Sequence, residues 1–124
     1  MSTDNELEAE IQAKGKTAPR VTPADIEANI ASEWYFTAME GVEGTDPKAT
    51  VYGQWEEEFP DVLGTLTFCV LVLKNGFMVT GESSCASPDN FGFESGRKVA
   101  RANAVQKLWP LLGFLLKEKL HDKA

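Results

Sequence analysis

Three cationic side chains, Arg97, Lys98 and Arg101, are the group in this sequence whose types and spacing most favour binding chemistry. Arg97 and Arg101 are one helical turn apart and Lys98 is adjacent, so all three would lie on the first turns of one exposed helix face. Free N–H groups at a helix N-terminus also attract anions. The pattern indicates a site for phosphate, in nucleic acid or in a nucleotide-like ligand. The alternative is a solubilising face that is partly paired with Glu94.

A second candidate site combines Ser83 and Ser84, at the end of an expected strand, with Asn90 and Phe91 ahead of an expected helix. Together they would form a polar loop with one aromatic side chain between sheet and helix, where an anion or another ligand could bind. Serine and asparagine also form turns and cap helices, which is the alternative explanation for the same residues.

Residues that serve as catalytic bases or metal ligands are sparse. The one histidine, His121, lies near the C-terminus, so a cysteine or serine nucleophile would have no base in the core. Cys69 and Cys85 do not have the spacing of zinc ligands, and no phosphate-binding glycine motif follows a strand. The expected core offers only Glu82 and Glu94 as a carboxylate pair. We therefore expect no enzymatic activity, no metal site and no cofactor.

The net charge of −7 is unevenly distributed. Residues 1–62 contain fourteen acids and four bases, which gives −10, whereas residues 63–124 contain five acids and eight bases, which gives +3. The basic half could serve an acidic partner or be neutralised within the fold. Residues 1–10 lack the apolar segment of a signal peptide, and no apolar run approaches the roughly 20 residues of a membrane span. We expect no contact with a membrane.

The elements that must position these residues form one α+β domain, over about residues 21–120, preceded by a disordered tail at residues 1–20. A helix is expected from Pro23 to Glu33, because Thr22 can cap it and proline suits its first position. A short strand is expected over residues 34–39.

Glycine, proline and glutamate then interrupt any periodic pattern, which predicts an acidic loop at about residues 41–63. A second helix is expected from Phe93 to Leu108, where Trp109-Pro110 would end it or start a new one. Residues 121–124 would fray.

Between the acidic loop and the second helix, the sequence predicts a β-hairpin. Residues 65–74 and 77–84 are extended apolar runs joined by Asn75-Gly76, which is typical of a two-residue turn. That turn would place Cys69 opposite Glu82. The sulfur atoms of Cys69 and Cys85 would then be roughly 10 Å apart along the strands, too far for a disulfide, so two free thiols are expected.

Both faces of the first hairpin strand are apolar, so one should pack against the long helix and the other against something else. Small residues at positions 96, 100 and 104 favour close approach of that helix to the sheet. Because the chain is short of helices to cover both faces, we expect a homo-oligomer, most simply a dimer. The side chains expected at its interface are Cys69, Leu71, Leu73 and Met78.

The hairpin sequence (66–85), Gly96-Arg-Lys-x-Ala-Arg (96–101), Lys107-x-Trp-Pro-Leu (107–111) and Gly113-Phe114 resemble the gene-product-49/66 family of small proteins from tailed phages and prophages. The resemblance extends over Val21–Ala38 and Leu66–Leu120. It implies a phage origin and a place in the host cytoplasm, and it implies no particular reaction.

The run Arg97-Lys98-Val99-Ala100-Arg101, followed by Ala104, is also similar to the start of the last helix in double-stranded RNA-binding domains. In those domains the element order is helix, hairpin sheet, helix, and this helix lies across phosphates. The likeness supports the topology, whereas the overall charge of −7 argues against RNA binding.

From these observations we expect a non-enzymatic phage accessory protein that binds a host protein or a small host-derived ligand, as in host takeover or anti-defence. One alternative is a nucleic-acid-binding module that uses Arg97, Lys98 and Arg101. Another is a structural protein associated with the virion.

Overall fold

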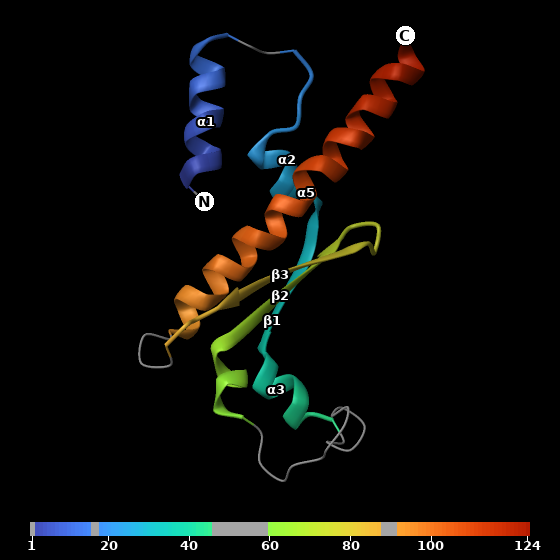
Figure 1. The fold of residues 1–124 in the computed structure, drawn as a ribbon. Coiled ribbons are helices and arrows are strands. Elements are labelled where there is room, and N and C mark those ends of the chain that lie inside the picture. Colours follow the sequence, from blue (N-terminus) through green and yellow to red (C-terminus); the bar gives the residue numbers. More distant parts are fainter. Residues whose placement is uncertain (1, 16–17, 46–59, 88–91) are drawn as a thin grey trace.

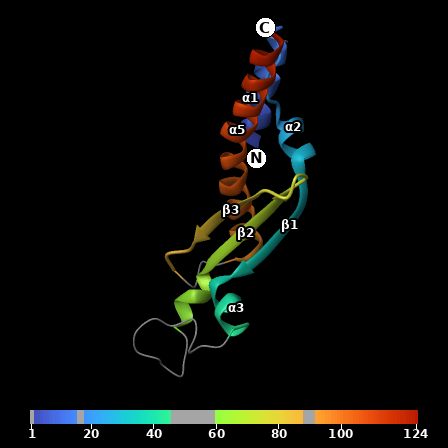
Figure 2. The ribbon, with the colours of Figure 1, turned by 90° about the vertical axis from the view of Figure 1, so that its right-hand side faces the viewer.

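A computed structural model describes residues 2–15, 18–45, 60–87 and 92–124. A three-stranded antiparallel sheet, in the order β1 (Ile30–Thr37), β2 (Leu66–Leu73) and β3 (Met78–Ser84), lies against one long helix, which crosses a single face of the sheet (Figures 1 and 2). None of the described helices is long and apolar enough to cross a membrane. The elements are α1 (Ser2–Ala13), α2 (Pro23–Asn29), β1 (Ile30–Thr37), α3 (Ala38–Glu43), the 3-10 helix η1 (Asp61–Thr65), β2 (Leu66–Leu73), β3 (Met78–Ser84) and α5 (Phe93–Lys123).

The α+β class and the order of helix, antiparallel sheet and long helix are confirmed. The sequence also predicted how α2 begins. Thr22 accepts a hydrogen bond from the N–H of Asp25, whose carboxylate accepts one from the Thr22 N–H, and Pro23 occupies the first turn. The helix ends at Asn29, four residues before its predicted end, because Ile30 already pairs with Leu73 of β2. Strand pairing therefore begins at Ile30, although the helical spacing of apolar residues in the sequence continues beyond it.

The hairpin turn is one residue longer than predicted. The N–H of Leu73 donates to the carbonyl of Phe77 (2.8 Å), and the N–H of Gly76 donates to the carbonyl of Leu73 (2.9 Å). Gly76 has a φ of +89°, and no residue other than glycine has positive φ in the described part of the chain. A two-residue type I′ turn needs positive φ at both central residues. Asn75 does not have positive φ, so the connection takes three residues, Lys74 to Gly76, and the Asn75 side chain accepts a hydrogen bond from the Phe77 N–H.

The extra residue shifts the pairing of β3 with β2 by one position. Because side chains alternate along a strand, each side chain of β3 then lies on the opposite face of the sheet from the one predicted. Cys69 lies opposite Gly81, not Glu82, and Leu71 lies opposite Val79. Cys69 and Cys85 are both free thiols, as expected.

The face of β2 that α5 covers contains Cys69, Leu71 and Leu73, with exposed fractions of 0, 0 and 6%. Our assignment of these three side chains to an oligomer interface was therefore wrong, since they form the core of the monomer. Met78, the fourth predicted interface residue, lies on the opposite face and is 60% exposed.

Small residues allow α5 to lie close to the sheet, as predicted. Ala100 and Ala104 are completely buried, and Gly96 is buried one turn earlier. Gly81 of β3 faces them, and a methyl group added there would lie 2.1 Å from the Ala100 carbonyl oxygen. The backbones of β3 and α5 are therefore in direct contact.

The long helix does not end before Pro110 but continues through it to Lys123. Proline removes one backbone hydrogen bond from a helix interior. Leu112, one turn beyond the preceding core residue Leu108, is 8% exposed and packs in the core, which favours continuation. The last turns of α5 extend beyond the sheet (Figure 1) and include the segment 121–123 that was expected to fray.

The N-terminal segment, predicted to be a disordered tail, contains helix α1. Arg20 donates hydrogen bonds to both carboxylate oxygens of Glu8, and the Trp109 indole N–H donates to Asp4 (3.3 Å). The hydrogen bond from Arg20 lowers the pKa of Glu8 to about 2. These contacts join residues that are 12 and 105 positions apart, so local periodicity could not indicate them.

Most of the predicted acidic loop (46–59) lies outside the described residues. At its margins the structure has α3 and η1. Thr37 and Glu40 form a reciprocal capping box that starts α3 directly after β1.

Candidate functional site

The predicted cationic site is assembled on α5, but its most central member is already paired within the fold. The Arg101 guanidinium donates to both carboxylate oxygens of Glu27 on α2 (2.8 and 3.1 Å) and to Glu33 on β1 (3.0 Å). The hydrogen bonds from Arg101 to these carboxylates, first of all to Glu27, raise its pKa further above its usual range. Arg101 therefore joins α5 to α2 and β1.

Arg97 and Lys98 also have partners. The Arg97 guanidinium lies over the Tyr35 ring, 5.8 Å from its centre, and Lys98 lies 3.4 Å from Glu94 at the exposed start of the helix. Burial, with help from a hydrogen bond that its hydroxyl donates to Glu33 (2.9 Å), raises the pKa of Tyr35. Tyr35 thus remains a neutral platform.

The charges around this site balance. Three cations, Arg97, Lys98 and Arg101, stand beside three carboxylates, Glu27, Glu33 and Glu94, so the formal sum is zero. With Tyr35 and Phe93, most of these residues line an open hollow of about 400 Å³. Attraction of phosphate depends on cations that are free to neutralise it. The arrangement therefore favours the alternative in which the cationic face is largely structural.

Replacing Arg101 with methionine is expected to lower the free energy of unfolding by about 1 kcal/mol, because it leaves two carboxylates without their shared partner. Lys98→Met is the matched control and should change stability by less than about 0.5 kcal/mol, since the Lys98–Glu94 pair is highly exposed. Urea denaturation at low and high salt measures both. Equal effects of the two substitutions would contradict a structural role for Arg101.

The second predicted site is only partly described. Ser83 and Ser84 line a hollow of about 180 Å³ together with Cys85, Gly92, Ser95, Gly96 and Val99. The structure brings the two serines to the start of α5, as predicted, whereas Asn90 and Phe91 lie outside the described residues.

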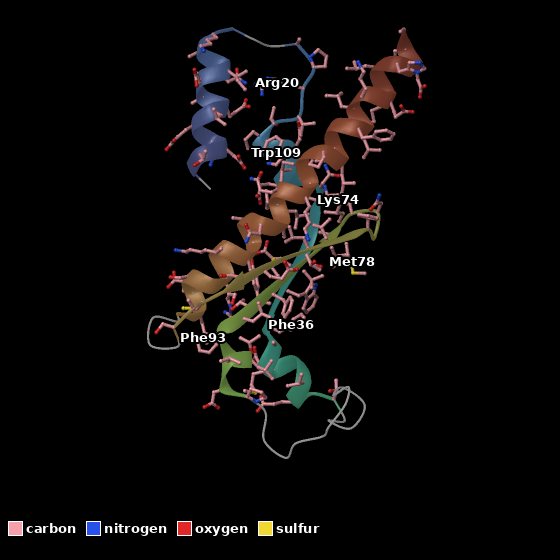
Figure 3. All side chains as sticks on the ribbon, in the orientation of Figure 1. Arg20, Phe36, Lys74, Met78, Phe93 and Trp109 are labelled. Atoms are coloured by element: carbon pink, nitrogen blue, oxygen red, sulfur yellow. The ribbon has the colours of Figure 1, made fainter. Side chains whose placement is uncertain are left out.

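A different surface, which the sequence did not place correctly, lies on the face of the sheet away from α5. Trp34 (61% exposed), Phe36 (39%) and Met78 (60%) project from it. Figure 3 shows Phe36 and Met78 on this side of the sheet. Half-buried side chains of β2 lie between the outer strands, namely Leu66, Phe68, Val70 and Val72. We call these seven side chains the open sheet face.

The open sheet face is apolar over β1 and β2 and polar over most of β3. Phe36 stacks on Phe68 with ring centres 5.3 Å apart, and the Trp34 indole N–H donates to the Ser32 hydroxyl (3.0 Å). On β3, Thr80 and Glu82 are exposed on the same side. The period-two pattern of Ser32, Trp34 and Phe36 could have revealed this face, had β1 been predicted to begin at Ile30.

A further groove of about 380 Å³ lies between α1, α2 and α5. Ile26, Val105 and Trp109 are among its apolar lining residues, and Asp4 and Glu27 among its acidic ones. Within the described ranges, no group of three or more histidine, cysteine, aspartate or glutamate side chains could hold a metal ion.

The fold and these surfaces define a class of protein: a small α+β domain in which a long helix covers one face of the sheet, while several apolar side chains on the other face are exposed among the described residues. The chain belongs to the phage protein (N4 Gp49/phage Sf6 gene 66) family, whose model matches residues 21–120. The family resemblance inferred from the hairpin and helix motifs is thereby confirmed. No curated protein and no solved structure matches the chain significantly.

Proposed function

We propose that the protein is a non-enzymatic phage accessory protein that binds a host protein through the open sheet face. The observation that carries the proposal is the exposure of Trp34, Phe36 and Met78 on the face of the sheet opposite α5, which α3 approaches only at its Phe36 end. Aromatic side chains and methionine are enriched at protein interfaces, and a contiguous exposed apolar patch commonly marks an interaction site.

The shape of this face supports a protein as partner in preference to a small molecule. Small ligands usually bind in concave sites that enclose most of their surface, whereas a sheet face offers a broad surface without enclosure. Membership of a phage family supports a role in phage infection, and we extend this to a partner in the host cytoplasm and to roles such as host takeover or anti-defence. The balanced charges around Arg101 disfavour the alternative of a nucleic-acid-binding module.

Photo-crosslinking in the host tests this proposal. With p-benzoylphenylalanine in place of Trp34, we expect a covalent adduct to one host protein after irradiation of cells that produce the full chain. The matched control places the same amino acid at Val62, which is equally exposed (63%) but lies on η1. Purified partner should then bind wild type and not Trp34→Glu in isothermal titration calorimetry.

Other outcomes would contradict the proposal in distinct ways. Adducts to virion proteins in infected cells would favour the structural alternative. Equal adducts at positions 34 and 62 would show that the open sheet face is not selective. Salt-sensitive binding of duplex RNA or DNA at about 50 mM salt would restore the nucleic-acid alternative.

A further inference from the structure

We infer that, in the free protein, two copies of this chain cover each other's open sheet faces in a symmetric and reversible dimer. The dimer must separate before a host protein can bind this face, and that last step rests on the proposed function. The dimer itself rests on the composition, register, charge and area of the face.

The composition of the open sheet face is self-complementary. The side chains of β1 and β2 on this face form an apolar strip, with Trp34 and Phe36 on one strand and Phe68 and Val70 on the next. A two-fold axis brings the same strip of the second copy onto it, as in the isologous interfaces of most homodimers. Two sheets packed face to face keep their strands within about 30° of one another.

The register of the sheet shows how two copies fit. Trp34, Val70 and Thr80 lie at one level across the three strands. Consider a two-fold axis that runs between the two sheets at this level, parallel to their planes and perpendicular to the strands. It places Trp34 against Trp34 of the second copy. Phe36 and Glu82, which share the next level, then lie over the opposite end of the second sheet.

Charge does not prevent this arrangement, although each copy has a net charge of −7. Among the residues of the three strands that alternate onto this face, Glu82 alone is charged, and it lies on the outer strand β3. In the arrangement above, the two Glu82 residues would be offset by about 13 Å along the strands. That separation exceeds the screening length of about 8 Å at physiological salt.

The available area indicates a weak dimer. The three exposed and four half-buried side chains present roughly 500 Å² per copy, within the range of large surface patches on monomers. Two such faces would bury about 1,000 Å² in total, against about 1,600 Å² for a standard stable interface. We therefore expect dissociation in the micromolar range, which would leave the face accessible to a tighter-binding partner.

Sedimentation equilibrium of the full chain between about 1 and 500 µM tests the inference. Wild type should fit a monomer–dimer equilibrium with a micromolar Kd. Trp34→Glu should weaken dimerisation at least tenfold, because like charges then meet at the axis. Phe114→Glu is the control, since Phe114 is 67% exposed and lies on α5, outside the open sheet face. It should leave the Kd within about twofold.

A charge-exchange experiment tests the symmetry directly. Trp34→Glu and Trp34→Lys should each dimerise at least tenfold more weakly than wild type when alone, and should form a tighter heterodimer when mixed, because opposite charges then meet across the axis. Circular dichroism checks that each variant is folded. Met78→Glu, on the opposite outer strand, provides a second variant if either Trp34 substitution unfolds the chain.

A wild-type chain that is monomeric at 500 µM would overturn the dimer. So would a dimer that is lost in Phe114→Glu but retained in Trp34→Glu, since the interface would then be the end of α5. Host adducts at position 34 from a monomeric chain would leave the proposed function standing without the dimer. A dimer with no host adduct would leave the dimer standing without that function.

Discussion

Replacing Gly81 with alanine is expected to lower the free energy of unfolding by about 3 kcal/mol, a large effect for one added methyl group. Its Cβ would lie 2.1 Å from the carbonyl oxygen of Ala100, 2.3 Å from the backbone nitrogen of Ala104 and 2.9 Å from the Ala104 Cα. These are backbone atoms of α5, so no change of side-chain rotamer can relieve the overlap. The helix must move away from β3, which opens the core beneath it.

Gly113→Ala is the matched control, because nothing beyond its chain neighbours and the nearby backbone of its own helix lies within 4 Å of the position a Cβ would occupy there. That substitution should raise the free energy of unfolding by about 0.5–1 kcal/mol, the usual gain when alanine replaces glycine inside a helix. Urea denaturation followed by circular dichroism measures both variants. A loss below about 1 kcal/mol for Gly81→Ala would show that β3 and α5 are not in backbone contact.

Leu71→Ala is expected to cost about 3 kcal/mol, whereas Val70→Ala, one position earlier, should cost less than about 1 kcal/mol. Leu71 is completely buried between the sheet and α5, and Val70 is half-buried on the open sheet face. Removing the buried side chain leaves a cavity in the core, while removing the other leaves a surface that water can fill.

Urea denaturation at a concentration where the chain is monomeric separates these effects from self-association. Comparison of Leu71→Ala with Val70→Ala tests which face of β2 is covered. The opposite ranking, with Val70→Ala the more damaging, would support the predicted interface, in which Leu71 lies on the face that the helix leaves uncovered. Near-equal losses would indicate that both faces are buried in the species under study.

Features with local causes could be predicted from the sequence. The capping box at Thr22, the position of the hairpin turn and the small side chains at 96, 100 and 104 depend on neighbours within about one turn or one strand. The family was also identified from contiguous motifs. The presence of two apolar faces on β2 followed from its composition, and it correctly indicated that the long helix would cover only one of them.

Which of the two faces the helix covers depended on the tertiary structure. Asn75-Gly76 is compatible with turns of two or three residues, and one residue of difference reassigns every side chain of β3. The predicted interface named Cys69, Leu71 and Leu73, which are core residues, and missed Trp34 and Phe36, which are exposed.

The same distinction between local and distant interactions applies to the candidate sites. The helical spacing of Arg97, Lys98 and Arg101 was evident in the sequence, but the partners of Arg101 lie 68 and 74 residues earlier. The contacts of α1 with Arg20 and Trp109 are similarly distant. Helix starts and turns arise from interactions between residues that are always near one another in the chain. Register, burial and ion pairing arise between segments that become neighbours only when the chain folds, so the tertiary structure decided them.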